Sequence, residues 1–232
     1  MEGYLIKEAY DLIWLWNGKK EKASQEIPFF RELQERHFTY SETLDYWNTF
    51  YTRAIENQLD VVHLPFVHHN TIGRGNKTLV HGPAFEWRQE QLFTQAFNEV
   101  DTGQGQIPTM ELKVEGSIYL QFRYPNIWMN HIADKIRIVI AFVPVDEKNT
   151  VMIIRYYHLL TRIPIIKEFI GWTGKISSIL IERQDKRVVE TQEPKISEWK
   201  SDEKLLKGDR PIIEFRKMRD QLKADAEKDQ ED

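Results

Sequence analysis

The chain has 232 residues, of which 41% are hydrophobic and 29% charged, a balance typical of a soluble globular domain. Its net charge of −4 argues against a nucleic-acid-binding protein, which usually carries a basic excess. No apolar run approaches the roughly 20 residues of a transmembrane helix, and Tyr4–Trp16 does not read as a secretory signal, so we expect a cytoplasmic protein.

The sequence contains no cysteine. A Rieske [2Fe–2S] cluster is held by Cys and His together, and Cys-rich zinc sites need thiolates. These residues therefore hold neither, and any metal bound here takes its ligands from His, Asp, Glu or water.

The first predicted elements are a pair of strands over residues 4–16, with a turn at Asn17-Gly18. A long helix is predicted next, over residues 44–62, because apolar residues recur at steps of three and four. Thr39 and Glu42 have capping-box spacing at its start. The apolar residues on this face are Leu44, Trp47, Tyr51, Ile55, Leu59 and Val62.

Residues 77–158 are typical of an antiparallel meander of about six or seven strands, because short runs rich in Val, Ile, Phe, Tyr and Thr alternate with turn residues. The runs are Leu92–Phe97, Met110–Val114, Ser117–Tyr124, Ile127–Ile132, Ile136–Val143 and Val151–His158.

A second long helix is predicted over about 165–181, with Pro164 at a first helical position and Gln184-Asp185 beyond its end. A final helix begins near Pro211, and the charged residues 220–232 favour a disordered tail. The pattern predicts an α+β fold with a long helix packed across the concave face of an antiparallel sheet.

The candidate metal-binding residues lie in one segment. Asp60 and His63 are one helical turn apart, and His68 follows the break at Pro65, so its ring can turn back toward His63. Two imidazoles and a carboxylate on one side of a metal leave positions open for oxygen and substrate, an arrangement that suits non-haem Fe(II).

The spacing alone does not exclude that these residues have a purely structural role. A His on an apolar helix is commonly a hydrogen-bonded core residue, and His69 could be mistaken for the ligand beside it. Asp185 on its own reads as a carboxylate near the end of a helix.

The motif Asn57-x-x-Asp60-x-x-His63-x-x-x-x-His68 resembles the N/E-x-x-D-x-x-H-x-x-x-x-H signature of the catalytic domain of Rieske non-haem iron oxygenases. The branch that it resembles most is the vanillate-demethylase and pheophorbide-oxygenase type, whose helix-grip fold is shared with START and Bet v 1-like proteins. Further resemblances are found in Ile13–Gly18, Tyr124–Asn126, Phe142–Asp146, Gln184–Gln192 and Gly208–Arg216.

The resemblance implies that His63, His68 and Asp185 ligate a mononuclear Fe(II), and that Asp60 passes electrons from a cluster-ligating His of a neighbouring subunit. Asn57 would support the site from the same helical face. The resemblance also divides the chain into residues 1–28, like the end of a Rieske domain plus a linker, residues 29–219, the catalytic domain, and the tail 220–232.

The implied activity is hydroxylation or demethylation of a hydrophobic, ring-containing substrate by O2. The electrons would come from a [2Fe–2S] centre on a separate chain or further domain, supplied by a Rieske or ferredoxin donor and its reductase. Whether the iron domain works with a separate cluster protein, belongs to a longer chain or is inactive stays open. So does the choice between the family's homotrimer and a monomer.

Two other functions fit the same residues. The helix-grip scaffold also serves hydrophobic-ligand carriers, since a fold does not fix a function. The His, His and Asp set could instead hold Zn²⁺ for hydrolysis. The identity of the bound metal distinguishes the three.

Overall fold

In the computed structural model, which describes residues 4–24 and 26–231, a seven-stranded antiparallel sheet has the order β3-β9-β8-β7-β6-β5-β4. This is the predicted α+β class. The strands are β3 (Thr39–Trp47), β4 (Leu79–Arg88), β5 (Gln91–Glu99), β6 (Leu120–Arg123), β7 (Ile127–Ala133), β8 (Ile136–Pro144) and β9 (Thr150–His158). The helices are α1 (Glu32–Glu35), α2 (Tyr51–Leu59), α3 (Leu64–Val67), α4 (Pro164–Val189) and α5 (Arg210–Glu231), with short 3₁₀ turns at Lys20–Lys22, Thr109–Glu111 and Lys207–Asp209.

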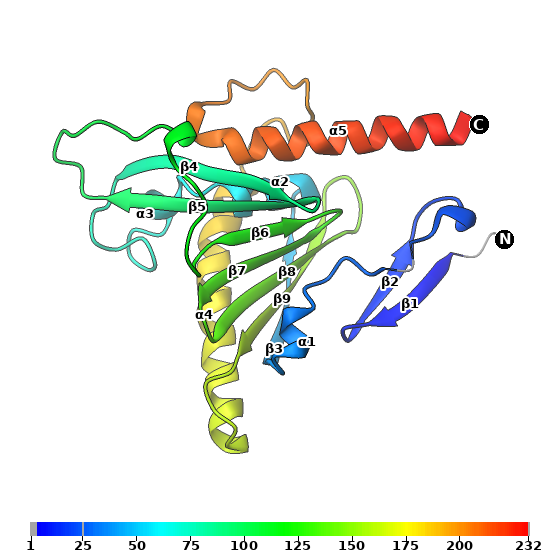
Figure 1. Ribbon diagram of the computed structural model, residues 1–232, viewed down its shortest axis with the longest axis horizontal. Coiled ribbons are helices and arrows are strands. Elements are labelled where there is room, and N and C mark those ends of the chain that lie inside the picture. The colour runs from blue at the N-terminus through cyan, green and yellow to red at the C-terminus, as the bar shows by residue number, and fades with distance from the viewer. Residues whose placement is uncertain (1–3, 25, 232) are drawn as a thin grey trace.

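The predicted strand pair is present as a separate hairpin of β1 (Leu5–Ala9) and β2 (Leu12–Trp16). Its turn residues Tyr10 and Asp11 both have positive φ, as a tight hairpin turn requires. The hairpin lies to one side of the large sheet (Figure 1). It is tied to the sheet by Arg155, whose guanidinium donates hydrogen bonds to the carbonyl oxygens of both turn residues.

The two faces of the large sheet bury different cores. One face carries Phe122, Ile140 and Phe142, which pack with α2 and with Phe215 of α5. The opposite face carries Met129 and its neighbours on β8, which are covered by the segment from Phe29 to Phe38 that includes α1. Because both faces are covered, most residues of β7 and β8 are buried, while the strand ends are more exposed.

Helix α4 crosses the first of these faces, and Figure 1 shows it running along the sheet. Two glycines allow the close approach. A Cβ at Gly171 would lie 2.2 Å from the Ser41 hydroxyl of β3, and a Cβ at Gly174 would lie 2.3 Å from the Tyr156 ring of β9. The predicted helix packed across the sheet is confirmed, with Pro164 in its first turn, but it continues to Val189, beyond the expected end near 181.

The predicted helix over residues 44–62 is wrong in its first half. Residues Thr39–Trp47 form the edge strand β3, and the helix α2 begins only at Tyr51. Side chains of β3 alternate between more and less exposed positions, the period of a strand. Leu44 and Trp47 matched a helical step by coincidence, because they belong to a different element from Ile55. The Thr39 and Glu42 pair therefore caps no helix.

Two other expectations are corrected. Met110–Val114 is not a strand, and its first residues belong to the turn at Thr109–Glu111. The missing member of the sheet is β4, in which His81 and Ala84 flank a bulge at Gly82-Pro83 that breaks the alternation. Helix α5 extends through Glu231, so residues 220–231 are helical where the composition favoured disorder. Only the first turns of α5 pack against the core, so the rest of this helix needs few apolar residues and resembles a disordered segment in composition.

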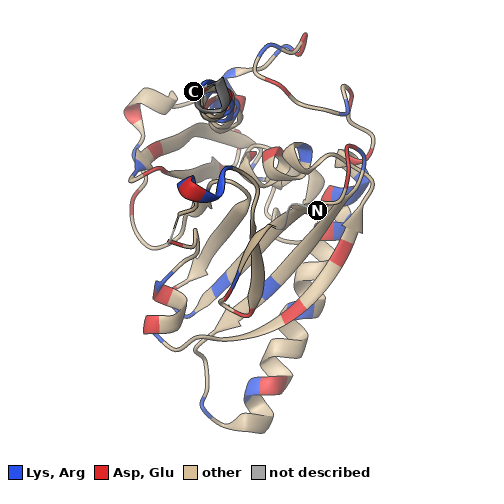
Figure 2. Cartoon of the chain, turned by 90° about the vertical axis from the view of Figure 1, so that its right-hand side faces the viewer, with Lys and Arg blue, Asp and Glu red and all other residues tan. Residues whose placement is uncertain are grey.

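Acidic and basic residues are interspersed over the elements in the view of Figure 2. Within the described part of the chain, none of the helices combines the length and the apolar character needed to span a membrane.

Candidate metal centre

Three side chains from distant parts of the chain meet at one point. The Nε2 atoms of His63 and His68 lie 3.2 Å apart, and each lies close to Oδ1 of Asp185, at 3.3 Å and 3.1 Å respectively. The three atoms therefore form a nearly equilateral triangle. Among the described residues, these three side chains are the group of His and carboxylate residues with the geometry to hold a metal ion.

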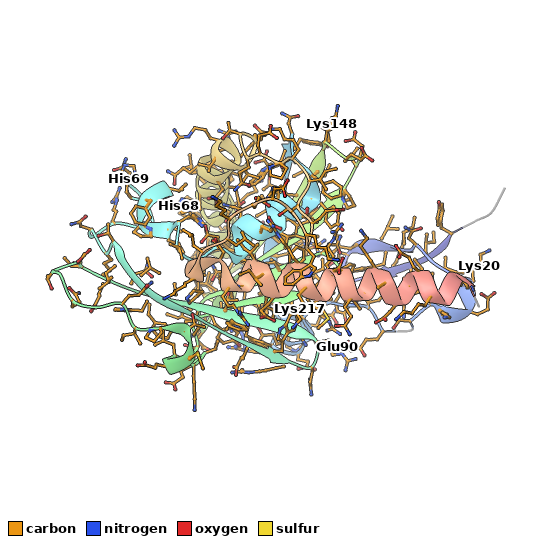
Figure 3. The ribbon with its side chains drawn as sticks, turned by 90° about the horizontal axis from the view of Figure 1, so that it is seen from above. Lys20, His68, His69, Glu90, Lys148 and Lys217 are labelled. Carbon is orange, nitrogen blue, oxygen red and sulfur yellow. The ribbon has the colours of Figure 1, made fainter. Side chains whose placement is uncertain are left out.

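The two histidines are placed by the single turn of α3. His63 immediately precedes this helix, Pro65 lies in its first turn and His68 immediately follows it. The proline ends the preceding pattern and starts the new turn, so both rings emerge on one side, at an interplanar angle of 61°. His69 is exposed and bonds to the Phe66 carbonyl, and it lies farther out than His68 in Figure 3.

Gly73 lets the chain fold back against α3. Its N–H donates to the carbonyl oxygen of His68, and a Cβ at this position would lie 2.1 Å from the carbonyl oxygen of Leu64. Two non-bonded carbon and oxygen atoms cannot come so close, so only glycine fits here without moving the turn that carries both histidines.

Asp185 comes from α4 and is 2% exposed. The sequence placed it beyond the end of the helix, whereas it lies inside the helix, four residues before Val189. This correction matters for rigidity, because a side chain within a packed helix is held more firmly than one on a connecting loop.

Each histidine ring has a partner behind it. The Nδ1 atom of His68 lies 2.7 Å from Oε1 of Gln184, which also accepts a hydrogen bond from the Thr71 hydroxyl. The Nδ1 atom of His63 lies 3.5 Å from Oδ2 of Asp60, a charge contact without a hydrogen bond. The acceptor behind His68 keeps the proton on Nδ1 and the lone pair on Nε2, the form in which imidazole binds a metal, and the charge of Asp60 favours the same tautomer of His63.

Asp185 is also linked to a chain of buried polar side chains. Asn57 donates a hydrogen bond to Asp185 Oδ1 at 3.4 Å, and Gln58 donates to Asn57 at 3.1 Å. The Gln58 amide reaches Oε2 of Glu182 at 3.3 Å as well. Helices α2 and α4 are thus joined beside the three candidate ligand atoms, with Asn57 next to the Asp185 carboxylate.

The charges of this cluster favour a cation. Burial lowers the pKa of His63, but hydrogen bonds and charge from Asp185 and Asp60 outweigh it and raise that pKa to about 10. Burial raises the pKa of Asp185, and its contacts with the two imidazoles more than reverse this, so the pKa is lowered. Burial and the nearby carboxylates of Asp185 and Asp45 raise the pKa of Glu182 well above its ordinary value.

The three inward-facing atoms fit a metal ion. In the form that binds a metal, with the ring protons on Nδ1, two lone pairs and a carboxylate oxygen face one another and need a cation between them; without a metal, a proton on His63 supplies that positive charge. Ligand atoms at neighbouring positions around a first-row divalent ion, with bonds of about 2.1 Å, lie about 3.0 to 3.4 Å apart. The measured separations of 3.1 to 3.3 Å fall in that range.

The ligand atoms face a cavity of about 370 Å³ between α4 and the sheet. Its wall is largely apolar, with Trp128 and Ile138 on the strands and Ile181 on the helix, and its volume suits a small ring compound. The two histidines and Asp185 themselves line it. A molecule bound there would lie directly beside a metal held by the three residues.

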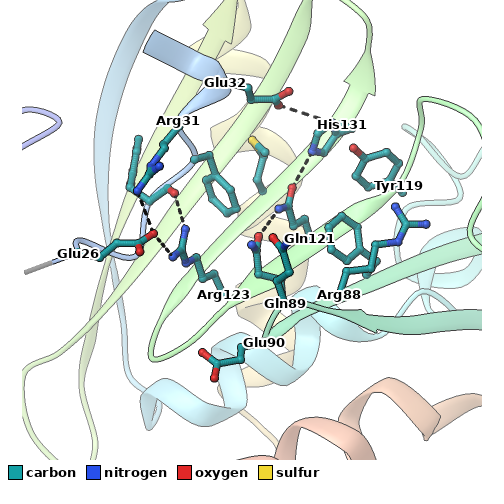
Figure 4. A pocket seen from close by; sticks show the side chains of 15 residues that line it. Glu26, Arg31, Glu32, Arg88, Gln89, Glu90, Tyr119, Gln121, Arg123 and His131 are labelled. Carbon is teal, nitrogen blue, oxygen red and sulfur yellow. Dashed lines mark hydrogen bonds and ion pairs between the residues drawn. The ribbon is translucent and has the colours of Figure 1, made fainter. Parts of the chain in front are cut away.

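A second hollow, of about 760 Å³, lies on the opposite face of the sheet. Figure 4 shows its polar lining, in which Glu26 pairs with Arg31 and Arg123, and His131 bonds to Gln121. These charges neutralise one another, and the described metal-ligand group lies on the other side of the sheet.

The sequence analysis named the three candidate ligand residues together with Asp60 and Asn57, and the structure brings these five side chains together. It missed Gln184 as the partner of His68, although Gln184 directly precedes Asp185. It also missed Glu182, whose place one helical turn before Asp185 on a helix facing the sheet was the available signal.

Comparison with known proteins identifies a family for most of the chain. A family model described as "Vanillate O-demethylase oxygenase C-terminal domain" matches residues 47–225. A search of curated proteins finds no match.

Several solved structures share the fold. A QL mutant of NdmA from Pseudomonas putida CBB5, solved with caffeine, is 20% identical with a TM-score of 0.70, over 92% of this chain and 59% of that one. Dicamba monooxygenase bound to dicamba is 14% identical with a TM-score of 0.68, over 95% and 70%. The quaternary ammonium Rieske monooxygenase CntA, in complex with L-carnitine, is 14% identical with a TM-score of 0.59, over 94% and 60%.

At these identities the structures show a common fold, the predicted helix-grip arrangement, and the chain spans 59% of the length of the NdmA structure. The family match covers most of the chain, from the end of β3 into α5. The chain therefore belongs to the family of vanillate O-demethylase oxygenase C-terminal domains.

Proposed function

We propose that the protein is the mononuclear iron component of an oxygenase, with His63, His68 and Asp185 as the iron ligands. The observation that carries the proposal is the triangle of ligand atoms, with sides of 3.1 to 3.3 Å, at the wall of a mostly apolar cavity. Bound ferrous iron would supply O2 activation beside a substrate that is hydroxylated or demethylated.

The residues of the chain would have distinct tasks. Gln184 and Asp60 would hold the imidazoles in the metal-binding tautomer, and Asn57 would hold the Asp185 carboxylate toward the same point. The apolar wall would exclude water and orient a hydrophobic, ring-containing substrate.

Asp60 would also be the entry point for electrons from a Rieske [2Fe–2S] centre outside these 232 residues. Its Oδ1 accepts the Val62 N–H, its Oδ2 faces the His63 ring, and its side chain remains partly exposed. It can therefore contact an external partner and an iron ligand at once. The homotrimer typical of the family would bring such a partner to it.

Metal analysis tests the iron site. The chain, purified and exposed anaerobically to Fe²⁺ or Zn²⁺ in separate samples, should retain close to one equivalent of iron. Variants His63→Ala, His68→Ala and Asp185→Asn should each lose it, while His69→Ala, which changes the exposed neighbour, should keep it. Iron retained equally by all four variants would refute the assignment of these ligands. A strong preference for zinc together with hydrolytic turnover would favour the hydrolase instead.

The electron route needs a separate test. With a reduced Rieske-type protein as donor, Asp60→Asn should slow donor reoxidation by the iron-loaded chain in the presence of O2. Iron content should stay unchanged, as should the rate at which the ferrous chain reacts with hydrogen peroxide, which needs no donor. An Asp60→Asn variant with the donor rate of the unmodified chain would exclude this route.

A ligand carrier is the second candidate, and the mostly apolar cavity favours it. A carrier would bind ring compounds equally well after Asp185→Asn and would contain no stoichiometric iron.

A further inference from the structure

The N-terminal end of α4 extends beyond the strands of the large sheet, at the lower end of the helix in Figure 1. Ile165, Phe169 and Trp172 follow one another at steps of four and three residues, so they share one side of this helix. Gly171 and Gly174, in the same turns, face the sheet. The shared side therefore turns away from the sheet.

The apolar side chains at this end of α4 are exposed to an extent unusual for their size. Ile165 is 84% exposed, Phe169 62% and Trp172 54%, and the rings of Phe169 and Trp172 lie 6.2 Å apart. Single exposed apolar residues are common on protein surfaces, but several within one short segment form a patch that marks a contact site. Three further exposed apolar residues belong to the same segment, residues 160–172, which we call the α4 tip: Leu160, Ile163 and Ile166.

The charged side chains along the α4 tip are mostly basic, although the chain as a whole carries a net charge of −4. Arg162 and Lys167 lie within the tip and Lys175 lies just beyond it, while Glu168 is the acidic residue of the tip. None of the three cations forms an ion pair with another residue that the structure describes. The patch is therefore apolar with a basic margin.

A lipid surface suits this combination better than a second copy of the chain. Aliphatic and aromatic side chains beside Lys and Arg are typical of helices that lie in the interface of an anionic membrane. Trp sits there at the level of the headgroups, and long basic side chains reach the lipid phosphates. A symmetric contact between two copies would instead bring the same cations against one another. The charge of the α4 tip thus complements an anionic surface and opposes self-association.

We propose that the α4 tip binds the surface of an anionic lipid bilayer. Ile165, Phe169 and Trp172 would insert at the boundary between headgroups and acyl chains. Arg162 and Lys167 would contact the lipid phosphates. The helix would lie on the membrane without crossing it.

This contact would place the mostly apolar cavity near the membrane surface. Ser178, which lines the cavity, follows Trp172 on α4 by six residues, or about 9 Å along the helix axis. The inference goes beyond the proposed function and needs no metal in the site, so it holds or fails independently of the iron ligands.

Flotation with lipid vesicles tests the proposal. The unmodified chain should float with phosphatidylcholine vesicles that contain about one-third phosphatidylglycerol. At least about tenfold less protein should float with phosphatidylcholine alone, because each basic residue near an anionic surface strengthens binding about fivefold. Raising the salt concentration from about 0.05 to about 0.5 M should release the protein. Absence of binding to the anionic vesicles, or binding that responds to neither lipid charge nor salt, would overturn the proposal.

Paired substitutions of apolar residues locate the contact. Ile165→Ser with Phe169→Ser should reduce flotation at least about tenfold. Met110→Ser with Leu206→Ser, which changes side chains 98% and 74% exposed outside α4, is the matched control and should float like the unmodified chain. Because all four side chains are exposed, both variants should keep the fold. Equal flotation of the two variants would show that the α4 tip is not the contact.

Paired charge reversals test the basic margin. Arg162→Glu with Lys167→Glu should reduce flotation on anionic vesicles at least about tenfold. Lys148→Glu with Lys217→Glu, two exposed residues outside α4 that are labelled in Figure 3, makes the same change in net charge and should have little effect. A loss of the same size in both variants would mean that only net charge matters, which contradicts a contact at the α4 tip.

Light scattering without vesicles examines the alternative occupant. The unmodified chain and the variant with Ile165→Ser and Phe169→Ser should have the same mass. An oligomer that this variant dissociates would assign the α4 tip to a second copy of the chain and overturn the lipid proposal. Iron content should be equal in the two proteins, so a failure of the iron site would be recognised separately.

Discussion

The imidazole of His68 is fixed from behind by Gln184, whose Oε1 lies 2.7 Å from Nδ1. The same oxygen lies 2.9 Å from the Thr71 hydroxyl, and as a carbonyl oxygen it only accepts, so the His68 Nδ1 donates to it. The helix that carries Asp185 therefore also sets the tautomer of the His68 imidazole.

Replacing Gln184 by Leu should weaken metal binding about 10- to 100-fold, the usual cost of losing such a supporting hydrogen bond. Gln184→Glu keeps an acceptor and should retain most of the affinity. Arg183→Ala changes the exposed neighbour on the same helix and serves as control. Competition titration with a metal indicator measures all three, and undiminished affinity in Gln184→Leu would contradict the role.

Gly73→Ala should destabilise the protein by about 1 to 3 kcal/mol and weaken metal binding as well, because the new methyl group pushes against the turn that carries both histidines. Urea unfolding and metal titration measure the two effects.

Gly105→Ala is the matched control for this change. A Cβ at Gly105 would meet no atom within 4 Å, so both measurements should be nearly unchanged. Equal effects of the two substitutions would show that the close approach of Gly73 to α3 is unimportant.

The metal should compete with a proton at His63. In the metal-free protein the pKa of His63 is raised to about 10, from an ordinary value of 6.5. The stability gained from the protonated ring is then fully present below pH 6.5 and is lost as the pH rises through 10. Metal-free protein should therefore lose stability between pH 7 and pH 9.5, measured as a falling Tm.

The variant His63→Gln cannot titrate at this position and should show a flatter dependence over the same range. Zn²⁺ affinity should rise by up to about tenfold per pH unit between pH 6 and pH 8, since one proton must leave for the metal to bind. An affinity independent of pH would show that no proton is displaced.

His131 should make the protein less stable in acid, because its pKa is shifted in the opposite direction to that of His63. Burial, helped by the charges of Arg137 and Arg36, lowers the pKa of His131 to about 3. Between pH 6.5 and pH 3 the unfolded chain binds a proton there that the folded chain does not, so stability falls as the pH falls. His131→Gln should show a shallower loss of Tm from pH 6.5 to pH 4, whereas His69→Gln at an exposed position should follow the unmodified protein.

Local patterns predicted the meander and the two histidines, because each depends on residues close together in the chain. The long helix predicted over residues 44–62 failed for a physical reason. In β3 the apolar residues fall on both sides of the strand: Leu44 is exposed, whereas Trp47 is buried on the side that faces α4, so their three-residue spacing only mimics a helical step. Strand β4 was not predicted because the bulge beside Gly82 interrupts the alternation of its side chains.

The carboxylate ligand could not be derived from spacing. Along the chain, strands β4 to β9 lie between His63 and Asp185. The two side chains meet only because Gly171 and Gly174 let α4 pack closely on the sheet. Resemblance to the family pointed to Asp185, whereas local sequence favoured an ordinary carboxylate near a helix end. The contacts of Gln184 and Glu182 depend on the same packing.

Helix α4 carries both the candidate ligand Asp185 and part of the wall of the apolar cavity. On α4, Ser178, Ile181 and Glu182 precede Asp185 by seven, four and three residues, and a helix rises about 1.5 Å per residue. Along the helix axis these three side chains therefore lie from about 4.5 to about 10.5 Å from Asp185. They can be exchanged to accommodate different molecules while Asp185 stays in place, which makes the scaffold easy to diversify.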